Sequence, residues 1–435
     1  MKNIKKSYFI IFGLIVLAVV CFSTSYAIFS NTKEEHGKLN IVAGTLNYKI
    51  ESSELDSDSI TLPANTSKEI RIKLTSLNEV SSKYELYYIL DKTNNKVSVG
   101  YSKDTKDSVL GTVEANKNKI ITIVIRNDSD ISSKVTFKVL GGLLNNNLAL
   151  KDGNSLNQEV SIYRVLSKAI LEDNKLITAT PTLTTSSNNT NDASGLYSST
   201  ATNTGEPTYY FRGNVTNNYV KFAGFTWRIV RINEDGTVRL IMQDGINNNA
   251  SIVFNSNYNN YTYMYYTNSQ VKTQLESWYH TNIGSKKDLA KNVASGAYYC
   301  EQAKAKRDSS WTSGNANMTL YSSYTPDFKC SSDGNNKGVV SANVGLLTYD
   351  EVAYAGGYFN QANNNYYLYN SAIYWWTMSP TGCAYGRSSV WTVYTTGYIH
   401  SSISDDARTV RPVLNINADT LVIGSGTSSN PYVIN

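Results

Sequence analysis

The stretch TYYFRGNVTNNYVKFAGFTWRIVRINEDGTVRLIMQDG, residues 208–245, decides the fold of the C-terminal half. Phe225, Trp227 and Ile229 occupy alternate positions, which is the period of a β-strand with one buried face. Residues 233–236, Asn-Glu-Asp-Gly, have the composition of a tight turn, and the apolar run at 237–242 returns as a second strand. The stretch therefore predicts a hairpin whose arms belong to a core.

Helical signals accompany this hairpin. Residues 271–279 have helical spacing after a cap at Asn268 or Ser269, and Thr348 with Glu351 makes a capping box for a helix ending at 356–357. A third helix is expected across 156–171, because its apolar residues share one helical face: Leu156, Val160, Tyr163, Leu166 and Ile170. This helix either closes a first domain or docks against the second.

The region from residue 37 to about residue 150 reads as strands. Segments such as SKEIRIKLTSL, KYELYYIL, NKIITIVIRN and KVTFKVL alternate or run in β-branched residues, and polar turns separate them. Several short strands with polar turns predict a β-sandwich. Residues 172–207, rich in Ser, Thr and Asn, read as a linker or as a long surface entry strand. The expected organisation is a leader at 1–27, a sandwich with a closing helix at 28–171, the linker, and an α+β domain at 208–435.

The N-terminus has the pattern of a signal peptide. Three lysines, at positions 2, 5 and 6, precede an apolar run at 8–22, and Ser25-Tyr26-Ala27 has small residues where a signal peptidase cuts. The run is short for a spanning helix, which favours cleavage after Ala27 over a retained anchor. Without these lysines the formal net charge falls from +5 to +2. We expect an extracellular or cell-surface protein that binds no nucleic acid and touches the membrane only through an uncleaved leader.

Export places the chain in an oxidising environment, so we expect a disulfide. Cys300 and Cys330 flank a Ser-rich insertion, and a bridge between them would stabilise the fold by about 3–4 kcal/mol. Cys383 is then left unpaired, although other pairings stay open.

Residue types that carry catalysis or bind metals are scarce. The chain has 3 His, none at ligand spacing to another, and no nucleophile elbow, phosphate loop or Cys-x-x-Cys motif. Asp405 and Asp406 are adjacent, so on a strand they point to opposite faces. We expect no enzyme activity, no metal and no cofactor, and the sequence does not imply calcium dependence, since no carboxylate cluster has cation spacing.

The stretch WWTMSPTGCAYGRSSVWTVYTTGYIHSSISDDARTVRP, residues 375–412, has an unusual composition. Asn is common elsewhere in the chain but absent between Asn370 and Asn415, and residues 381–409 also lack Lys, Glu, Gln and Met. Asp, Arg, His and Ser are present in this stretch, so burial in a core explains the absence of Asn, Lys and Glu poorly. Tyr, Ser and Gly, which this stretch uses freely, are typical of recognition loops.

Two resemblances follow from quoted segments. The leader ending SYAIFSN, followed by GKLNIVAGTLNYKI and ITLPANTSKEIRIKLTS, resembles the start of camelysin and TasA-type exported proteins of Gram-positive bacteria. This implies an Ig-like β-sandwich directly after the signal peptide, and some members of that family assemble into matrix fibres.

The second half is similar to bacterial surface domains of the C-type-lectin-like fold, through YYFRGNVTNNYVKFAGFTWRIVRI, LLTYDEVAYAGG, YWWTMSP, VRPVLNI and GSGTSSNPYVI. This fold is shared by formylglycine-generating enzymes and by variable proteins of diversity-generating retroelements. The enzyme branch depends on active cysteines, and Cys383 is the only one here without an evident partner.

The retroelement branch implies a variable region. Those systems rewrite adenines in Asn codons, which can yield Tyr, Ser, Thr, His, Asp, Ile, Gly, Ala, Arg, Cys, Val, Leu, Pro or Phe but not Lys, Glu, Gln, Met or Trp. Between residues 381 and 409 only Trp391 lies outside the reachable set. The expected displayed, ligand-contacting residues are Tyr385, Arg387, Tyr394, Tyr398, His400, Ser402, Asp405, Asp406 and Arg408. The expected scaffold residues are Trp375, Trp376, Val390, Trp391, Val393, Arg411 and Pro412.

Together these patterns predict an exported bacterial surface protein that displays a diversified surface to an extracellular protein or glycan. Two alternatives remain. The chain is a fibre subunit if the first domain dominates, or an oxidase of the formylglycine-generating type if Cys383 has a reactive partner.

Overall fold

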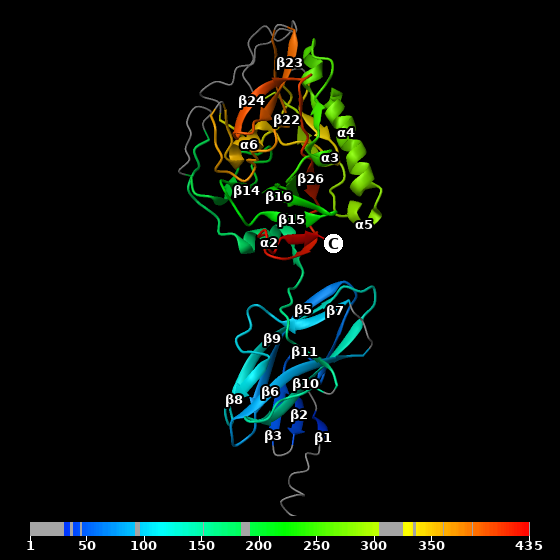
Figure 1. The fold of residues 1–435 in the computed structure, drawn as a ribbon, viewed down its shortest axis with the longest axis vertical. Helices are drawn as coiled ribbons and strands as arrows, with labels where there is room; N and C mark the ends of the chain where they lie inside the picture. Colours follow the sequence, from blue (N-terminus) through cyan, green and yellow to red (C-terminus); the bar gives the residue numbers. More distant parts are fainter. Residues whose placement is uncertain are drawn as a thin grey trace, which may run out of the picture. The chain divides into compact units, whose positions relative to one another are not determined.

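The computed structural model describes residues 30–34, 38–43, 46–91, 96–150, 152–183, 192–303, 325–333, 336–359, 361–384 and 386–434. The expected leader at 1–27 lies outside these residues. The chain is mainly β, as the sequence predicts, and divides into two compact units between Tyr163 and Arg164. Figure 1 shows the first unit in blue to cyan and the second from green to red.

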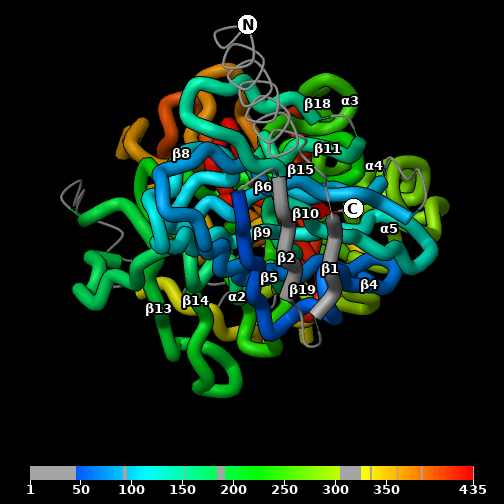
Figure 2. Tube along the Cα trace, turned by 90° about the horizontal axis from the view of Figure 1, so that it is seen from below, coloured from blue at the N-terminus to red at the C-terminus, as the bar shows by residue number. Residues whose placement is uncertain are grey.

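The first unit consists of strands in two sheets. One sheet has the order β1-β2-β3-β5-β9-β7, and the other has the order β11-β6-β10-β4, with β8 paired to β6. The strands are β1 (Ser30–Glu34), β2 (Lys38–Ala43), β3 (Leu46–Glu51), β4 (Ser59–Leu62), β5 (Thr66–Ser76), β6 (Ser82–Leu90), β7 (Val97–Tyr101), β8 (Leu110–Val113), β9 (Asn118–Asn127), β10 (Ser133–Leu143) and β11 (Asn154–Ser155). Figure 2 shows β5 beside β9, with which it pairs antiparallel.

Alternation of apolar and polar residues produces the core of the first unit. In β5, Ile70, Ile72 and Leu74 are buried while the charged residues between them are exposed. The same pattern in β6 and β10 buries Leu86 and Phe137 against them in one apolar cluster. Two antiparallel sheets therefore share one core, which is the arrangement that period-2 patterning favours.

The second unit begins at Arg164 and contains two larger sheets. One has the order β12-β27-β28-β15-β16-β14-β13 with β17 and β26 branching from β16, and the other has the order β18-β25-β22-β23-β24-β21; β19 and β20 form a separate pair. The first of these sheets contains β12 (Arg164–Val165), β13 (Gly195–Ser199), β14 (Thr208–Arg212), β15 (Tyr219–Phe222), β16 (Phe225–Ile232), β17 (Val238–Met242), β26 (Val413–Ile416), β27 (Leu421–Ile423) and β28 (Tyr432–Ile434). The others are β18 (Ser251–Val253), β19 (Tyr298–Cys300), β20 (Val339–Ser341), β21 (Tyr358–Phe359), β22 (Trp375–Ala384), β23 (Arg387–Val393), β24 (Tyr398–Ile403) and β25 (Ala407–Thr409).

Helical segments complete the second unit. They are α2 (Leu166–Asp173), α3 (Ile246–Asn249), η1 (Tyr261–Met264), η2 (Tyr266–Asn268), α4 (Gln270–Tyr279), η3 (His280–Gly284), α5 (Lys287–Ala290) and α6 (Tyr349–Ala355). Ser269 caps α4 and the Thr348–Glu351 capping box starts α6, which confirms both predicted helix starts. Within this unit β22, β23 and β24 lie at one end, and β15, β16 and α2 lie at the other (Figure 1).

The predicted hairpin is confirmed as β16 and β17. Gly236 adopts φ 82° and donates its N–H to the carbonyl of Asn233 at 3.0 Å, which closes the turn. The sequence predicts one buried face, but both faces of β16 are covered, so Arg228 and Arg231 are buried along with Trp227. The charged residues of this strand therefore do not mark a solvent face.

A buried ionic cluster pairs Arg231 of β16 and Arg239 of β17 with one carboxylate. Glu351 on α6 accepts hydrogen bonds from Arg239 at 2.6 Å and from Arg231 at 3.3 Å. Burial alone would raise the pKa of the Glu351 carboxyl, but the two guanidinium groups outweigh it and the pKa is lowered. The cluster ties α6 to the hairpin, and α6 lies next to β22.

The helix expected across 156–171 is wrong in extent, and of its two expected placements the structure shows the one against the second domain. Leu156 packs in the core of the first unit and Val160 donates its N–H to the carbonyl of Tyr101, so this part is extended. The observed helix α2 buries Leu166 and Ile170 in the core of the second unit. The helical spacing combined residues of two different units.

The boundary at 171 and the linker at 172–207 also need correction. Within 192–207, β13 pairs antiparallel with β14, and Ile177 donates its N–H to the carbonyl of Leu196 at 2.8 Å. These polar residues therefore form an edge of the second unit's sheet. Composition does not separate a linker from an entry strand, because Gly195, Ser198 and Ser199 dilute the strand signal of Leu196 and Tyr197, and the pairing with β14 stabilises the strand.

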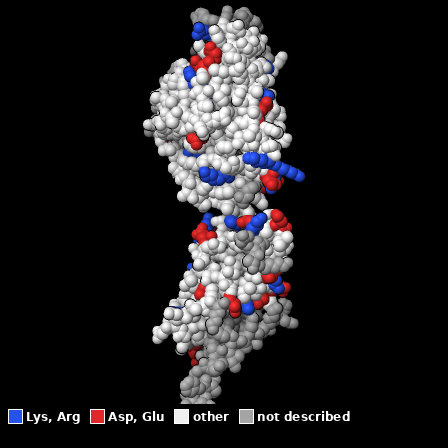
Figure 3. Space-filling model, turned by 45° about the vertical axis from the view of Figure 1, so that its right-hand side comes forward, with Lys and Arg blue, Asp and Glu red and all other residues white. Residues whose placement is uncertain are grey.

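Charge is sparse on the second unit, and the face presented in Figure 3 is mostly uncharged. Among the helices in the described ranges, none is long and apolar enough to span a bilayer.

Candidate functional site

A β-hairpin near the C-terminus positions the predicted variable residues. β23 and β24 pair antiparallel, with Thr392 opposite His400 and Val390 opposite Ser402. Between the strands, Gly397 adopts φ 82° and donates its N–H to the carbonyl of Tyr394 at 2.8 Å. A type I turn closed by a left-handed glycine is a common hairpin connection. It places Tyr394 and Tyr398 next to each other at the end of the hairpin.

Three tyrosines stack at this end, and we call Tyr374, Tyr394 and Tyr398 the tyrosine stack. The ring centroids of Tyr374 and Tyr394 lie 4.0 Å apart, and those of Tyr394 and Tyr398 lie 4.4 Å apart with an interplanar angle of 16°. All three rings are half-buried. Burial, followed by the interaction with Tyr374, raises the pKa of Tyr394, so its phenol stays neutral at physiological pH.

Polar and charged groups border the stack. His400 meets the rings of Tyr394 and Tyr398 edge-on, with centroids 5.6 Å and 6.0 Å away. The Arg408 guanidinium lies over the Tyr374 ring at 4.0 Å and forms an ion pair with Asp406 at 2.9 Å. The arrangement combines flat aromatic surface, a cation and hydrogen-bonding tips, which is the composition that recognition hot spots favour.

Hydroxyl groups on the buried side of the tyrosine stack form hydrogen bonds that hold it in place. The Tyr374 hydroxyl hydrogen-bonds the Ser402 hydroxyl at 2.5 Å, and Thr392 donates to the carbonyl of His400 at 2.7 Å. Ser402 is buried, so its expected display to a ligand is wrong: its place opposite Val390 turns it under the tyrosines. It is a supporting residue.

The structure separates the other expected ligand contacts from the stack. Arg387 is exposed at the start of β23, where it lies 5.9 Å from the Tyr258 ring, and Asp405 is exposed in the turn after β24. Asp406 reaches the stack only through Arg408. Tyr385 lies outside the described residues. The residues brought together are thus Tyr394, Tyr398, His400 and Arg408.

Tyr374 is the residue that sequence reasoning missed. It precedes β22 and lies outside the window 381–409, so a search by composition could not select it. Its backbone carbonyl accepts the N–H of Thr409 at 2.7 Å, which places its ring beside Arg408. The aromatic run at 374–376 marks a candidate recognition surface in the sequence. Only the sheet register shows that Tyr374 is half-buried whereas its neighbours Trp375 and Trp376 are buried.

The expected scaffold residues are buried beneath this surface. Trp375, Trp376, Val390, Trp391 and Val393 are each at most 2% exposed. Trp391 packs against Tyr349 and Phe359, with ring centroids 5.2 Å and 5.5 Å away.

Arg411 is also buried and anchors the chain just before β26. It donates to the carbonyls of Met242 and Leu368 at 3.0 Å and 3.2 Å, and its guanidinium lies 4.9 Å from the Trp375 ring. Burial, with the nearby Arg228 charge, lowers its pKa to about 10. The following residue, Pro412, is buried and accepts the N–H of Met242 through its carbonyl at 2.9 Å.

The cysteines pair as predicted. Cys300 and Cys330 form a disulfide with their Cα atoms 5.7 Å apart. Cys383 is free and fully buried on β22, and burial raises the pKa of its thiol. A buried thiol with a raised pKa is a poor nucleophile.

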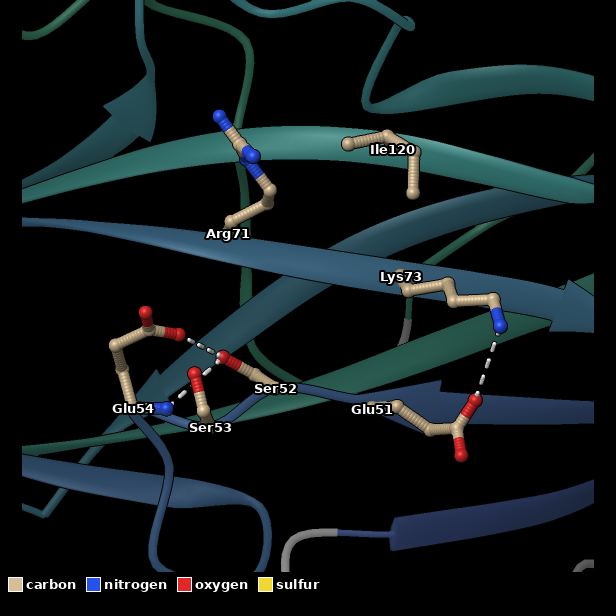
Figure 4. A pocket seen from close by; sticks show the side chains of 7 residues that line it. All are labelled: Glu51, Ser52, Ser53, Glu54, Arg71, Lys73 and Ile120. Atoms are coloured by element: carbon tan, nitrogen blue, oxygen red, sulfur yellow. Dashed lines mark hydrogen bonds and ion pairs between the residues drawn. The ribbon is translucent and has the colours of Figure 1, made fainter.

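A hollow of about 620 Å³ on the first unit does not combine aromatic rings with a cation as the tyrosine stack does. Figure 4 shows that its two glutamates have local partners: Lys73 lies 3.6 Å from Glu51, and Ser52 donates to Glu54 at 2.7 Å. Such exposed pairs face solvent and contribute little binding energy.

Within the described part of the chain, no group of three or more His, Cys, Asp or Glu side chains could hold a metal ion. In comparisons with known proteins, no family model matches the chain, and neither a curated protein nor a solved structure matches it.

Proposed function

We propose that this chain is an exported bacterial surface protein whose second unit is a C-type-lectin-like recognition domain, carried by an Ig-like β-sandwich. The observation that carries the proposal is the tyrosine stack bordered by His400 and Arg408, built on strands whose inner residues are buried. A rigid frame with adaptable aromatic tips is the design of a binding surface.

The difference in burial between residues of the hairpin supports diversification of this surface by a retroelement. In β23 and β24 the apolar residues Val390, Val393 and Ile399 are fully buried, whereas Tyr398 and His400 are half-exposed. Changes at the outer positions would alter the ligand without disturbing the core. The proposed ligand is an extracellular protein or glycan, and the proposed location is the cell surface, with which the Cys300–Cys330 disulfide is compatible.

The role we propose is binding rather than catalysis. The buried Cys383 supports this assignment, because its thiol is inaccessible and the other two described cysteines form a disulfide with each other. The fibre-subunit alternative rests on the first unit alone, and a sedimentation measurement on the exported chain separates it from the binding role.

An array experiment tests the proposal. The exported chain is labelled and applied to arrays of glycans and extracellular proteins, beside a Tyr394→Ser/Tyr398→Ser variant and a Tyr263→Ser control. Tyr263 is half-buried and lies outside the stack. We expect saturable binding to at least one target, weakened at least about tenfold in the double variant and unchanged in the control. Equal binding by all three proteins, or no binding, would contradict the proposal.

A further inference from the structure

A left-handed turn of asparagines lies elsewhere in the second unit. Asn247, Asn248 and Asn249 of α3 have φ values of 52°, 56° and 64° in succession. A left-handed conformation costs about 1–2 kcal/mol per L-residue, and Asn is among the few residues that adopt it routinely. Three such residues in a row persist only where the surrounding structure holds them.

Main-chain contacts hold this turn in place. Ile246 is buried and donates its N–H to the carbonyl of Val410 at 3.0 Å, while the Asn249 amide oxygen accepts the N–H of Gly245 at 2.5 Å. A Cβ at Gly245 would lie 2.1 Å from the Thr409 side chain, so the turn sits tightly against the chain after β25. The asparagine side chains are therefore presented from a fixed backbone.

The turn borders a cavity of about 450 Å³, within the size range of small-ligand sites. Aromatic surface forms part of its wall: Phe225 is half-exposed and its ring centroid lies 5.3 Å from that of Trp278 on α4. Residues of α3 line one part of the cavity and Trp278 of α4 lines another, and Figure 1 labels both helical segments.

Amides and a carboxylate form the polar part of the lining. Asp244, Asn247 and Asn248 line the cavity and are exposed, and within the described residues their side chains make no recorded hydrogen bond or ion pair. Asn282 donates to the carbonyl of Trp278 at 2.8 Å, which leaves its amide oxygen available. No lysine or arginine lines the cavity, so an anionic ligand would meet only the Asp244 carboxylate.

We infer that this cavity binds a neutral sugar ring. A pyranose has apolar C–H faces that pack on aromatic rings such as Phe225, and hydroxyls that both donate and accept. Planar amides and a carboxylate match those hydroxyls in pairs. The fixed left-handed turn lowers the entropy cost of ordering Asn247 and Asn248 on binding. This site is separate from the tyrosine stack and does not depend on its role.

The test uses substitutions that remove the amides while keeping the backbone. Gly adopts positive φ without steric cost, so Asn247→Gly/Asn248→Gly preserves the turn and loses both side chains. Asn336, exposed at φ 59° and outside the cavity lining, gives the matched control Asn336→Gly. The probes are the methyl pyranosides of glucose, galactose and mannose, N-acetylglucosamine, and glucuronate as the anionic counterpart of glucose.

Saturation-transfer NMR and calorimetry on the full chain give the readout. We expect at least one neutral sugar to bind with millimolar affinity, the double variant to bind it at least about tenfold more weakly, and the control to match the wild type. Glucuronate should bind more weakly than methyl glucoside. The inference is overturned if no neutral sugar binds saturably, if the double variant binds as the wild type does, or if glucuronate binds best.

Discussion

The rings of Tyr374 and Tyr394 lie 4.0 Å apart, although Tyr374 precedes β22 and Tyr394 follows β23. The antiparallel register of these strands, with Trp375 opposite Val393, makes this contact unavoidable, because the residues just beyond each end share one face. One tyrosine outside the candidate variable region therefore forms the platform on which two tyrosines inside it stack.

The interaction between the two rings should be measurable as a coupling energy in the free energy of unfolding. All 6 Trp residues lie after position 226, so tryptophan fluorescence reports on unfolding of the second unit alone. A double-mutant cycle of Tyr374→Ala and Tyr394→Ala in urea should give a coupling energy of about 0.5–1.5 kcal/mol, as offset aromatic pairs do. Strict additivity would show that the rings do not support each other. In a double-mutant cycle of Tyr374→Ala and Tyr263→Ala, whose rings form no contact among the described residues, the two losses of stability should add.

The hairpin turn requires glycine at position 397. A Cβ there would lie 1.8 Å from the carbonyl oxygen of Asn363, in addition to the positive φ of 82°. Gly224 has the same φ of 82° with nothing within 4 Å, so Gly224→Ala isolates the cost of backbone strain. We expect about 1–2 kcal/mol for Gly224→Ala and clearly more for Gly397→Ala, measured by urea unfolding. Equal losses would mean that the contact with Asn363 is not formed.

The buried Glu351 should control acid stability of the second unit. Its pKa is lowered in the folded state, so its stabilising contribution is present above the ordinary value of 4.5 and is lost as pH falls through the folded pKa. Glu351→Gln removes the carboxylate partner of Arg239 and leaves Arg231 paired with Glu234 alone, so it should cost about 3–5 kcal/mol at pH 7, with a smaller difference from wild type in acid.

Glu276→Gln is the matched control for this prediction. Glu276 pairs with Lys272 at 2.7 Å but is 49% exposed, so its loss should cost less than about 0.5 kcal/mol. If both variants lose the same stability, the Glu351 cluster does not hold the fold. Tryptophan fluorescence in urea at pH 7 and pH 4 gives both comparisons.

Thiol labelling should distinguish the cysteines in the chain from residue 28 onward. With the Cys300–Cys330 bridge intact, only Cys383 is free, and its burial should block modification until the second unit unfolds. Mass spectrometry should find no label on the native protein and one after denaturation. Rapid native labelling of Cys383 would contradict its burial and would reopen the oxidase alternative.

The sequence predicts the secondary structure better than the boundary between units. Strands such as β5 and the capping box of α6 follow from local patterns, and local patterns are what a single sequence shows. The helix expected at 156–171 is wrong because regular spacing does not reveal that Leu156 and Ile170 belong to different cores.

The candidate site is predictable in part. Composition selects Tyr394, Tyr398, His400 and Arg408, which the fold brings together around one stack. It does not select Tyr374, and it misplaces Ser402, since exposure depends on which strand lies opposite. Composition separates residue types, whereas register decides which side chains face solvent.

Sequencing the gene from several clones of one lineage tests diversification of this surface most directly. The account predicts differences confined to codons 381–409 and concentrated at outward positions such as Arg387, Tyr394, Tyr398, His400 and Asp405. Buried Val390, Trp391 and Val393 should be constant, and a template repeat with a reverse transcriptase gene should lie nearby. Differences spread evenly along the gene, or as frequent at the buried codons as at the outward ones, would contradict it.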